Sequence, residues 1–248
     1  MLPVQAQTLR VINDVWPPFS DASLQQHGLI PELLSLIFSD QDYQISYQEY
    51  PWTRVLRMAQ AGEADIISGL WYTDERSEYL LYSNPVYVSQ LKFLKRADDD
   101  FNYHNDLEAL RGKIIGIVSN YQYGEDFYDA DYFLRQPARD LHVNIDRLIH
   151  RRVDLTLGLE GVLKAAIDQL PHEQQQQLEL VDTPLKSVPV FIACAKANKN
   201  CERIITTFND KLERYKDSGV YTRLVGKYGL HKKGHTRLCA APDSNDKC

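Results

Sequence analysis

The first seventy residues alternate short apolar segments with longer amphipathic ones, and this alternation constrains the fold most. Three segments have the pattern of strands, at 8–13, 45–50 and 65–70, and two have the apolar spacing of helices, at 31–39 and 52–61. The last strand, DIISGL, is a continuous apolar run of the kind buried inside a parallel sheet. The order strand, helix, strand, helix, strand predicts an α/β sheet covered by helices.

The remainder of the chain continues this alternation. We expect further strands at 112–118, 142–143, 154–157, 178–181 and 188–195. We expect further helices at 121–130, 145–151, 161–169, 200–216 and 218–228. With 248 residues and roughly 150 residues in a typical domain, the chain is long enough for one large domain or two modest ones.

Composition excludes several classes of protein. No run approaches the roughly 20 apolar residues that a membrane-spanning helix needs. The chain has 28 Lys and Arg against 34 Asp and Glu, a net charge of −6, and lacks a basic block. We therefore expect no nucleic-acid partner.

The four cysteines, at positions 194, 201, 239 and 248, lack the C-x-x-C spacing of zinc ribbons and thioredoxins. Two close spacings, 194 to 201 and 239 to 248, suit two local disulfides in an oxidising compartment, and four free thiols in the cytosol are the alternative. His231 and His235 lie near Cys239, but a polar tail over 231–248 explains them better than a metal site. We expect neither a metal nor another cofactor.

The N-terminal residues bear on where the protein is located. Val4-Gln5-Ala6 resembles the small-residue end of a secretory signal peptide, although no charged or long apolar segment precedes it. We therefore expect a secreted protein whose signal peptide has been removed, which agrees with the disulfide interpretation.

One arginine stands where an α/β sheet binds its ligands. Arg76 follows the buried strand at 65–70, and ligands of such sheets bind beyond the carboxyl ends of the strands. The planar guanidinium matches a carboxylate with two parallel hydrogen bonds, and the Thr73 hydroxyl is placed to cap the turn. The alternative is a surface arginine paired with Asp74 or Glu75.

A second strand, loop and helix start lies at 116–124, GIVSNYQYG. Unpaired N–H groups at a helix start favour an anion, whereas capping by Ser119 or Asn120 is the ordinary alternative. Aromatic residues are also frequent where strands end, which suits stacking on a flat or apolar ligand, although core packing explains any single one. They are Trp16, Trp52, Trp71, Tyr72, Tyr87, Tyr121 and Tyr123. The chain lacks the G-x-S-x-G, H-E-x-x-H and Walker motifs of common enzymes.

Together these segments resemble the bacterial periplasmic solute-binding proteins of the polar amino-acid transporter type, family 3. The resemblance covers roughly residues 8–230, and the segment at 62–87, with its T-x-x-R and S-x-P patterns, is the most specific. WPP, PW-x-R and Trp71 indicate a branch of this family. The segments that carry the resemblance are VINDVWPPF (11–19), GLIPELL (28–34), PWTRVL (51–56), GEADIISGLWYTDERSEYLLYSNPVY (62–87), RGKIIGIVSNYQYG (111–124) and DSGVYTRLVGKYG (217–229).

The resemblance implies a set of ligand-binding residues. Arg76 would bind the ligand's α-carboxylate, and Trp16 would be the aromatic residue that covers the ligand. Most of the remaining residues line the pocket in the first lobe; they are Asn13, Gly69, Trp71 and Thr73. In the second lobe, Tyr121 and Gln122 would face the carboxylate, and Glu160 is the candidate partner of the ligand's ammonium.

Two of these positions depart from the family pattern. Trp71 stands where serine or threonine is usual, which removes a hydroxyl and fills space. The aspartate that holds the ligand's α-ammonium aligns with Leu159, and the adjacent Glu160 is the possible substitute. The ligand is therefore left open between an α-amino acid, a modified amino acid, an organic acid and an aromatic carboxylate.

The family pattern also implies the architecture and the role. It implies a type II periplasmic-binding-protein fold, in which two lobes, each a mostly parallel sheet flanked by helices, are joined by two hinge strands. The first lobe would comprise 8–90 with 188–230, and the second 95–183. We expect a monomeric, non-enzymatic periplasmic receptor that closes over a small carboxylate-bearing ligand and delivers it to a membrane ABC permease.

Two alternative functions remain open on the same fold. One is an extracellular ligand-sensing module for a signalling partner. The other is a lyase resembling cyclohexadienyl dehydratase, which would need an acid or base in the cleft, with Glu160 or Asp14 as candidates.

Overall fold

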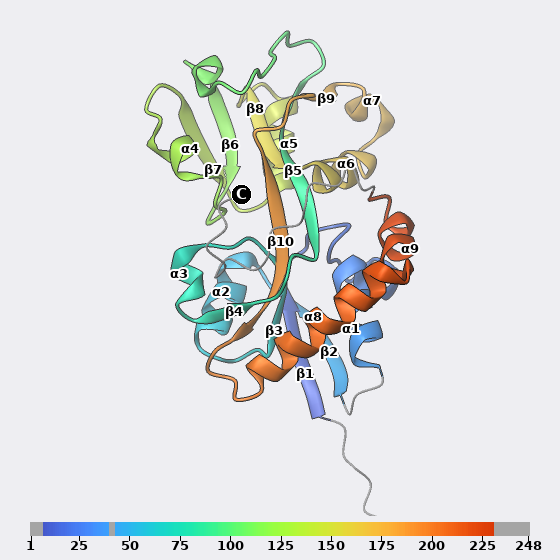
Figure 1. The fold of residues 1–248 in the computed structure, drawn as a ribbon. Coiled ribbons are helices and arrows are strands. Elements are labelled where there is room, and N and C mark those ends of the chain that lie inside the picture. The colour runs from blue at the N-terminus through green and yellow to red at the C-terminus, as the bar shows by residue number, and fades with distance from the viewer. Residues whose placement is uncertain (1–6, 40–42, 231–248) are drawn as a thin grey trace, which may run out of the picture. The chain divides into compact units, whose positions relative to one another are not determined.

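The computed structural model describes residues 7–39 and 43–230, which divide into two compact units. The first unit combines the described residues up to Val88 with those from Pro189 onward, and the second unit is Ser89–Val188. The chain passes from one unit to the other within two ten-residue strands, β5 (Tyr87–Arg96) and β10 (Lys186–Ala195) (Figure 1). The first unit is therefore built from two separate stretches of sequence.

The sheet of the first unit has the strand order β2–β1–β3–β10, with β4 also beside β10. Strand β1 is parallel to both of its neighbours, whereas β10 is antiparallel to β3 and β4. The strands that belong wholly to this unit are β1 (Gln7–Asn13), β2 (Tyr43–Glu49), β3 (Ile66–Leu70) and β4 (Leu80–Tyr82). Its helices are η1 (Gln25–His27), α1 (Leu29–Phe38), α2 (Trp52–Gln60), α3 (Asp74–Ser77), α8 (Cys201–Asp217) and α9 (Val220–Lys227).

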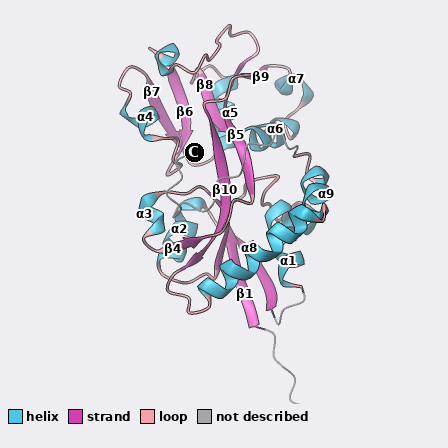
Figure 2. Ribbon diagram, in the orientation of Figure 1, coloured by secondary structure: helices cyan, strands magenta, loops and turns pink. Residues whose placement is uncertain are grey.

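Helices α1 and α2 connect the parallel strands of this sheet. The chain moves from β1 to β2 in one direction across the sheet and from β2 to β3 in the other. Because such crossovers are right-handed, the two helices cover opposite faces. Figure 2 shows α2 and α1 on either side of the strands, and α1 contacts α8 and α9. All five residues of β3 are buried, as expected for a strand covered on both faces.

The sheet of the second unit has the order β5–β8–β6–β7, with β9 also pairing β5. Strand β6 is parallel to β7 and β8, and β5 is antiparallel to β8 and β9. The other strands are β6 (Ile114–Val118), β7 (Leu134–Ala138), β8 (Leu155–Leu159) and β9 (Leu178–Leu180). The helices are η2 (Leu107–Leu110), α4 (Glu125–Asp129), α5 (Leu141–Ile149), α6 (Glu160–Asp168) and α7 (His172–Gln175).

The strand expected at 142–143 was wrong. These residues lie in α5, which begins after Asp140, whose side chain accepts a hydrogen bond from the Val143 N–H. The strand that precedes α5 is β7, which contains Pro137 and pairs only with β6 in the described sheet. An edge strand tolerates a proline that a central strand would not. Because Pro137 and the polar residues of 134–138 do not form the apolar pattern of a buried strand, the sequence did not predict β7.

The other differences lie mainly at element ends. Helix α4 covers only 125–129 of the expected 121–130, because the preceding residues form the loop after β6. The polar run at 174–177 partly belongs to the short helix α7, and the pattern predicted neither β4 nor β5. The remaining expected helices and strands are present, with ends shifted by a few residues.

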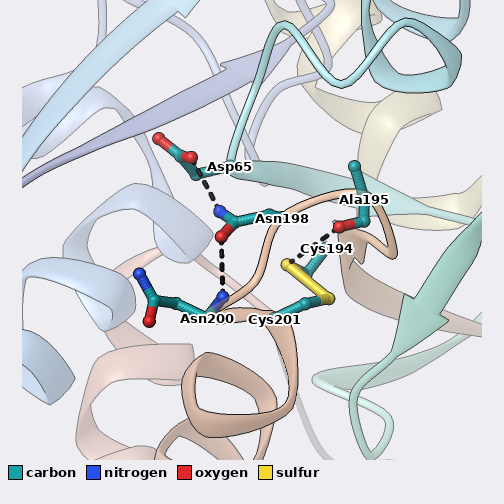
Figure 3. The surroundings of a disulfide bond; sticks show 6 residues. All are labelled: Asp65, Cys194, Ala195, Asn198, Asn200 and Cys201. Atoms are coloured by element: carbon teal, nitrogen blue, oxygen red, sulfur yellow. Dashed lines mark hydrogen bonds between the residues drawn. A yellow bond between two sulfur atoms is a disulfide. The ribbon is translucent and has the colours of Figure 1, made fainter.

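A disulfide joins Cys194, at the end of β10, to Cys201, the first residue of α8 (Figure 3). The turn between them is held further, because the Asn198 side chain donates to Asp65 at 2.8 Å and accepts from the Asn200 N–H at 2.9 Å. The predicted pairing of these two cysteines is therefore present. Cys239, Cys248, His231 and His235 lie outside the described residues.

We expect the double substitution Cys194→Ala with Cys201→Ala to lower the free energy of unfolding by about 2–3 kcal/mol. The bond closes a short loop and so limits the unfolded chain, and both side chains are buried in the folded unit. Urea denaturation of the oxidised protein and of the variant measures the difference. Dithiothreitol should destabilise the parent protein more than the variant, in which only Cys239 and Cys248 remain; equal sensitivity of both proteins would contradict the assignment.

Within the described part of the chain, every helix is too short or too polar to cross a membrane.

Candidate functional site

The parallel strands of the first unit bring three loops to one edge of its sheet. Strands β1, β2 and β3 run in the same direction, so their carboxyl ends lie at a common edge. The loops that follow them carry residues 14–19, 50–51 and 71–76. Because α/β sheets bind ligands at this edge, the residues of these loops form the first candidate binding surface.

Arg76 is buried at this edge, with 5% of its surface exposed. It lies in α3, whose first turn is capped by Thr73: the Thr73 hydroxyl accepts a hydrogen bond from the Arg76 N–H at 3.1 Å. The guanidinium donates from Nη1 to the Trp71 carbonyl at 3.2 Å and lies 5.3 Å from the centre of the Trp52 ring. Asp74 and Glu75, its acidic neighbours, are exposed. Arg76 is therefore held by the site's backbone and an aromatic ring.

The Trp71 carbonyl is a shared acceptor that fixes the position of Arg76. The Tyr82 hydroxyl also donates to it, at 3.3 Å. Burial raises the pKa of Tyr82 above its usual value, so the hydroxyl stays protonated and remains a donor. Strand β4 and the loop after β3 are thereby tied together around the arginine.

Asn13 and Gly69 meet beside Trp16. Asn13 ends β1 and is 1% exposed, and Gly69 in β3 has a φ of +93°. A Cβ atom on Gly69 would lie 3.5 Å from Asn13 Nδ2, 3.5 Å from Trp16 Cε3 and 3.1 Å from Ile30 Cδ1. The Nδ2 of Asn13 has no hydrogen-bond partner among the described residues. A buried amide donor of this kind requires an acceptor, which a water or a ligand supplies.

Trp16 is the centre of an aromatic group in the first unit. Its loop is closed by hydrogen bonds from the Trp16 N–H to the Ser20 carbonyl at 2.7 Å and from the Phe19 N–H to the Trp16 carbonyl at 2.9 Å. The Trp16 ring lies 6.1 Å from the Trp71 ring and 5.1 Å from the Phe19 ring, measured between centroids. The chain has three tryptophans, and Trp16, Trp52 and Trp71 all belong to this edge of the sheet.

In the second unit, the loop after β6 carries Tyr121 and Gln122. The Tyr121 carbonyl accepts from the Tyr128 hydroxyl at 2.7 Å, and Gln122 is exposed. Tyr123 is buried, and its hydroxyl accepts from the Val118 N–H at 3.0 Å, which holds the loop against the end of β6. Ser119 donates its hydroxyl to the Ala138 carbonyl at 3.0 Å, so it ties this loop to β7 rather than capping α4.

Glu160 follows β8 directly and is the first residue of α6. Its Oε1 lies 2.8 Å from Lys164 Nζ and 3.8 Å from Lys92 Nζ. Leu159, which the sequence resemblance aligns with an ammonium-binding aspartate, is 1% exposed and is paired with Leu91 of β5. At the carboxyl end of β8, the acidic side chain is therefore Glu160, and it is ion-paired with two lysines.

Six of the nine predicted residues gather in the first unit. The other three lie in the second unit: Tyr121 and Gln122 in the loop after β6, and Glu160 at the start of α6. The six are Asn13, Trp16, Gly69, Trp71, Thr73 and Arg76. Sequence reasoning missed Tyr82, which shares an acceptor with Arg76, and Lys92, which pairs with Glu160. Lys92 was detectable, because a lysine that interrupts the apolar run of β5 (YVSQLKFLKR) is unusual in a buried strand.

Comparison with known proteins identifies the family. Residues 9–231 match the family model described as bacterial extracellular solute-binding proteins, family 3. The chain belongs to this family. Its fold is accordingly the two-lobed α/β fold of the periplasmic binding proteins, as the resemblance implied.

The relatives of this family 3 chain are distant in sequence. A probable histidine-binding protein of Neisseria gonorrhoeae is 21% identical over 90% of this chain and 82% of its own length. A structure from a study of glutathione import by GshT and the cystine importer TcyBC of Streptococcus mutans is 18% identical. It covers 94% of this chain and 99% of its own, with a TM-score of 0.78.

A histidine kinase sensor domain with similarity to periplasmic binding proteins is also structurally close. It is 16% identical, covers 90% of this chain and 96% of its own, and has a TM-score of 0.78. At these identities the structural matches show the fold alone. In the described ranges, 7–39 and 43–230, no group of three or more His, Cys, Asp or Glu side chains is arranged to hold a metal ion.

Proposed function

We propose that this protein is a periplasmic receptor of an ABC importer that captures a small carboxylate-bearing solute. The observation that carries the proposal is Arg76: a nearly buried guanidinium, oriented by the Trp71 carbonyl and the Trp52 ring, at the sheet edge where such folds bind ligands. A buried arginine fork is suited to a carboxylate, because two parallel hydrogen bonds offset the loss of hydration of both charges.

The other residues of the edge supply what a carboxylate receptor needs besides charge. Asn13 offers a buried amide donor, and Trp16 and Trp71 offer aromatic surface for the rest of the ligand. In the proposed mechanism, the second unit completes the site through Tyr121, Gln122 and Glu160, and the ligand stabilises a closed state by its higher affinity for that state. A membrane permease then recognises the closed receptor.

Family membership and the names of the relatives support a transport role. Relatives of this chain are named histidine-binding and arginine-binding proteins, and one of them is named periplasmic. The sensor function remains the second candidate, because a histidine kinase sensor domain has the same fold at a TM-score of 0.78. Binding of the same ligand is expected in both cases, so the partner distinguishes them.

Intrinsic fluorescence tests ligand capture directly, because all three tryptophans belong to the proposed site. We expect a saturable change in tryptophan emission on titration with the correct carboxylate and no change with the corresponding amide. The same ligand should stabilise the folded protein, by roughly 2.7 kcal/mol at a concentration 100 times its dissociation constant. A screen of amino acids, 2-oxo acids and aromatic acids in which no compound does either would contradict the proposal.

A further inference from the structure

The short segment 83–86, between β4 and β5, lies where the chain is about to leave the first unit. It is bonded to β10, the other strand that connects the units. The Ser83 N–H donates to the Ile192 carbonyl at 3.0 Å, and the Ile192 N–H donates in turn to the Ser83 hydroxyl at 3.2 Å. The Val86 N–H donates to the Val190 carbonyl at 2.8 Å. Both connecting strands are therefore held together inside the first unit, beside the place where the chain crosses.

Two helices of the first unit also hold this segment. The side chain of Asn209 in α8 accepts a hydrogen bond from the Asn84 N–H at 2.7 Å. The Tyr221 hydroxyl, in α9, donates to the Val86 carbonyl at 2.6 Å. Tyr221 is 4% exposed, and burial raises its pKa above the usual value, so the hydroxyl stays protonated and remains a donor. Val86 thus has both backbone groups bonded, and the start of β5 has a fixed anchor.

Phe19 connects this anchor to the loop that carries Trp16. The Phe19 ring is fully buried, and its centroid lies 5.1 Å from that of the Trp16 ring. On the other side of the contact chain, it lies 5.7 Å from the ring of Tyr87, the first residue of β5. Closely packed side chains transmit a displacement, because few voids exist to absorb it. A movement of Trp16 therefore reaches Tyr87 through a single ring.

We infer that Phe19 is a positioning residue, which couples ligand contact at Trp16 to the start of β5 and so to the closing of the receptor. A ligand shifts a conformational equilibrium only by its differential affinity for the two states, so its contacts must depend on the strands that connect the units. Phe19 supplies this dependence for β5, and Tyr221 fixes the neighbouring backbone. This inference rests on the proposed function, because it assumes that a ligand contacts Trp16 and that its binding closes the receptor.

Small-angle X-ray scattering of the full-length protein tests the coupling. The probe is the tightest binder in a panel of the common amino acids, their 2-oxo acids and benzoate. We expect a saturating concentration of it to lower the radius of gyration of the parent protein. Phe19→Leu removes the ring and keeps an apolar side chain. We expect this variant to show about half or less of the parent's decrease at saturation, and to bind the probe about five-fold or more weakly. A local packing defect alone would weaken binding but leave the full decrease at saturation.

Two sets of variants provide the controls. Phe38→Leu makes the same substitution at a residue that is 1% exposed and lies 5.6 Å from the Tyr43 ring, so it removes a buried aromatic contact elsewhere in the first unit. We expect it to retain the parent's decrease in radius of gyration. Tyr87→Phe keeps the ring and should also retain the decrease, whereas Tyr87→Leu should reduce it. The Tyr87 pair keeps the test decisive if Phe19→Leu folds poorly.

The outcomes separate this inference from the proposed function. A full decrease at saturation in Phe19→Leu or Tyr87→Leu overturns the inference and leaves the proposed function intact. An equal loss in Phe38→Leu also overturns it, because the effect would then follow from general destabilisation. Binding that leaves the radius of gyration of the parent unchanged refutes the closing step, and the inference with it. If no compound of the panel binds, the proposed function itself is contradicted.

Discussion

Replacing Arg76 with alanine is expected to weaken binding of the carboxylate ligand at least 100-fold. Removing one partner of a buried, hydrogen-bonded charge pair costs roughly 2–5 kcal/mol, and each 1.4 kcal/mol corresponds to about ten-fold in affinity. Arg76 is 5% exposed, so the ligand carboxylate would be left without water to replace the lost donors. Calorimetric titration of the purified variant measures the loss.

Two further variants give this prediction its controls. Arg76→Lys keeps the positive charge but removes the planar fork, and we expect it to recover only part of the affinity. Arg54→Ala removes an exposed arginine whose guanidinium lies 4.1 Å from the centre of the Tyr50 ring. The affinity of this variant for the ligand should stay within about two-fold of that of the parent protein. Folding is monitored by circular dichroism, because Arg76 also bonds the Trp71 carbonyl. A folded Arg76→Ala protein with parental affinity would rule out the carboxylate clamp.

Gly28→Ala is expected to destabilise the first unit by about 3 kcal/mol. Gly28 has φ +100° and ψ 179°, a backbone conformation that residues with a Cβ rarely adopt. A Cβ there would lie 2.9 Å from the Phe19 carbonyl oxygen and 3.0 Å from that of Pro18, both backbone atoms. The same two carbonyls accept hydrogen bonds from the first N–H groups of α1, at Leu29 and Ile30. The loop that carries Trp16 is therefore fastened to α1 through this glycine.

Gly226→Ala is the matched control for this substitution. Gly226 lies within α9, and a Cβ on it would meet nothing within 4 Å. Alanine is favoured over glycine inside a helix by about 0.5–1 kcal/mol, so this variant should be slightly more stable than the parent. Thermal unfolding compares the two. Effects of the same sign would show that the contact of Gly28 with the 18–19 loop is unimportant.

The regular elements were largely predictable, because local patterns encode them. The buried strand at 65–70 and the amphipathic helix at 52–61 appear as β3 and α2. The failure at 142–143 has a physical cause: an edge strand needs neither continuous apolar residues nor every backbone N–H, so β7 lacked the expected signal. A strand whose position is determined by pairing with a distant segment cannot be predicted from the pattern of its own residues.

The sequence predicted many residues of the candidate site but few of the contacts between them. Arg76 was found because an arginine directly after a buried strand is unusual and matches the family motif. Tyr82 and Lys92 were missed, since their roles depend on pairings across the sheet, with β10 for β4 and with β8 for β5. The sequence pointed to Glu160 because it follows the aligned position, Leu159. Its pairing with Lys92, 68 residues upstream, and with Lys164, one helical turn downstream, became visible only in the structure.

By itself, the sequence determined the α/β class, the order of most elements, the family and the arginine that anchors the proposed site. These properties follow from local periodicity and short motifs, which a linear chain displays directly. Only the tertiary structure decided that Asn13 Nδ2 is buried without a hydrogen-bond partner among the described residues, that Gly69 lies against Trp16, and that Lys92 meets Glu160. Burial and charge pairing depend on which distant segments lie side by side, so the chemistry of a site emerges only when the chain has folded.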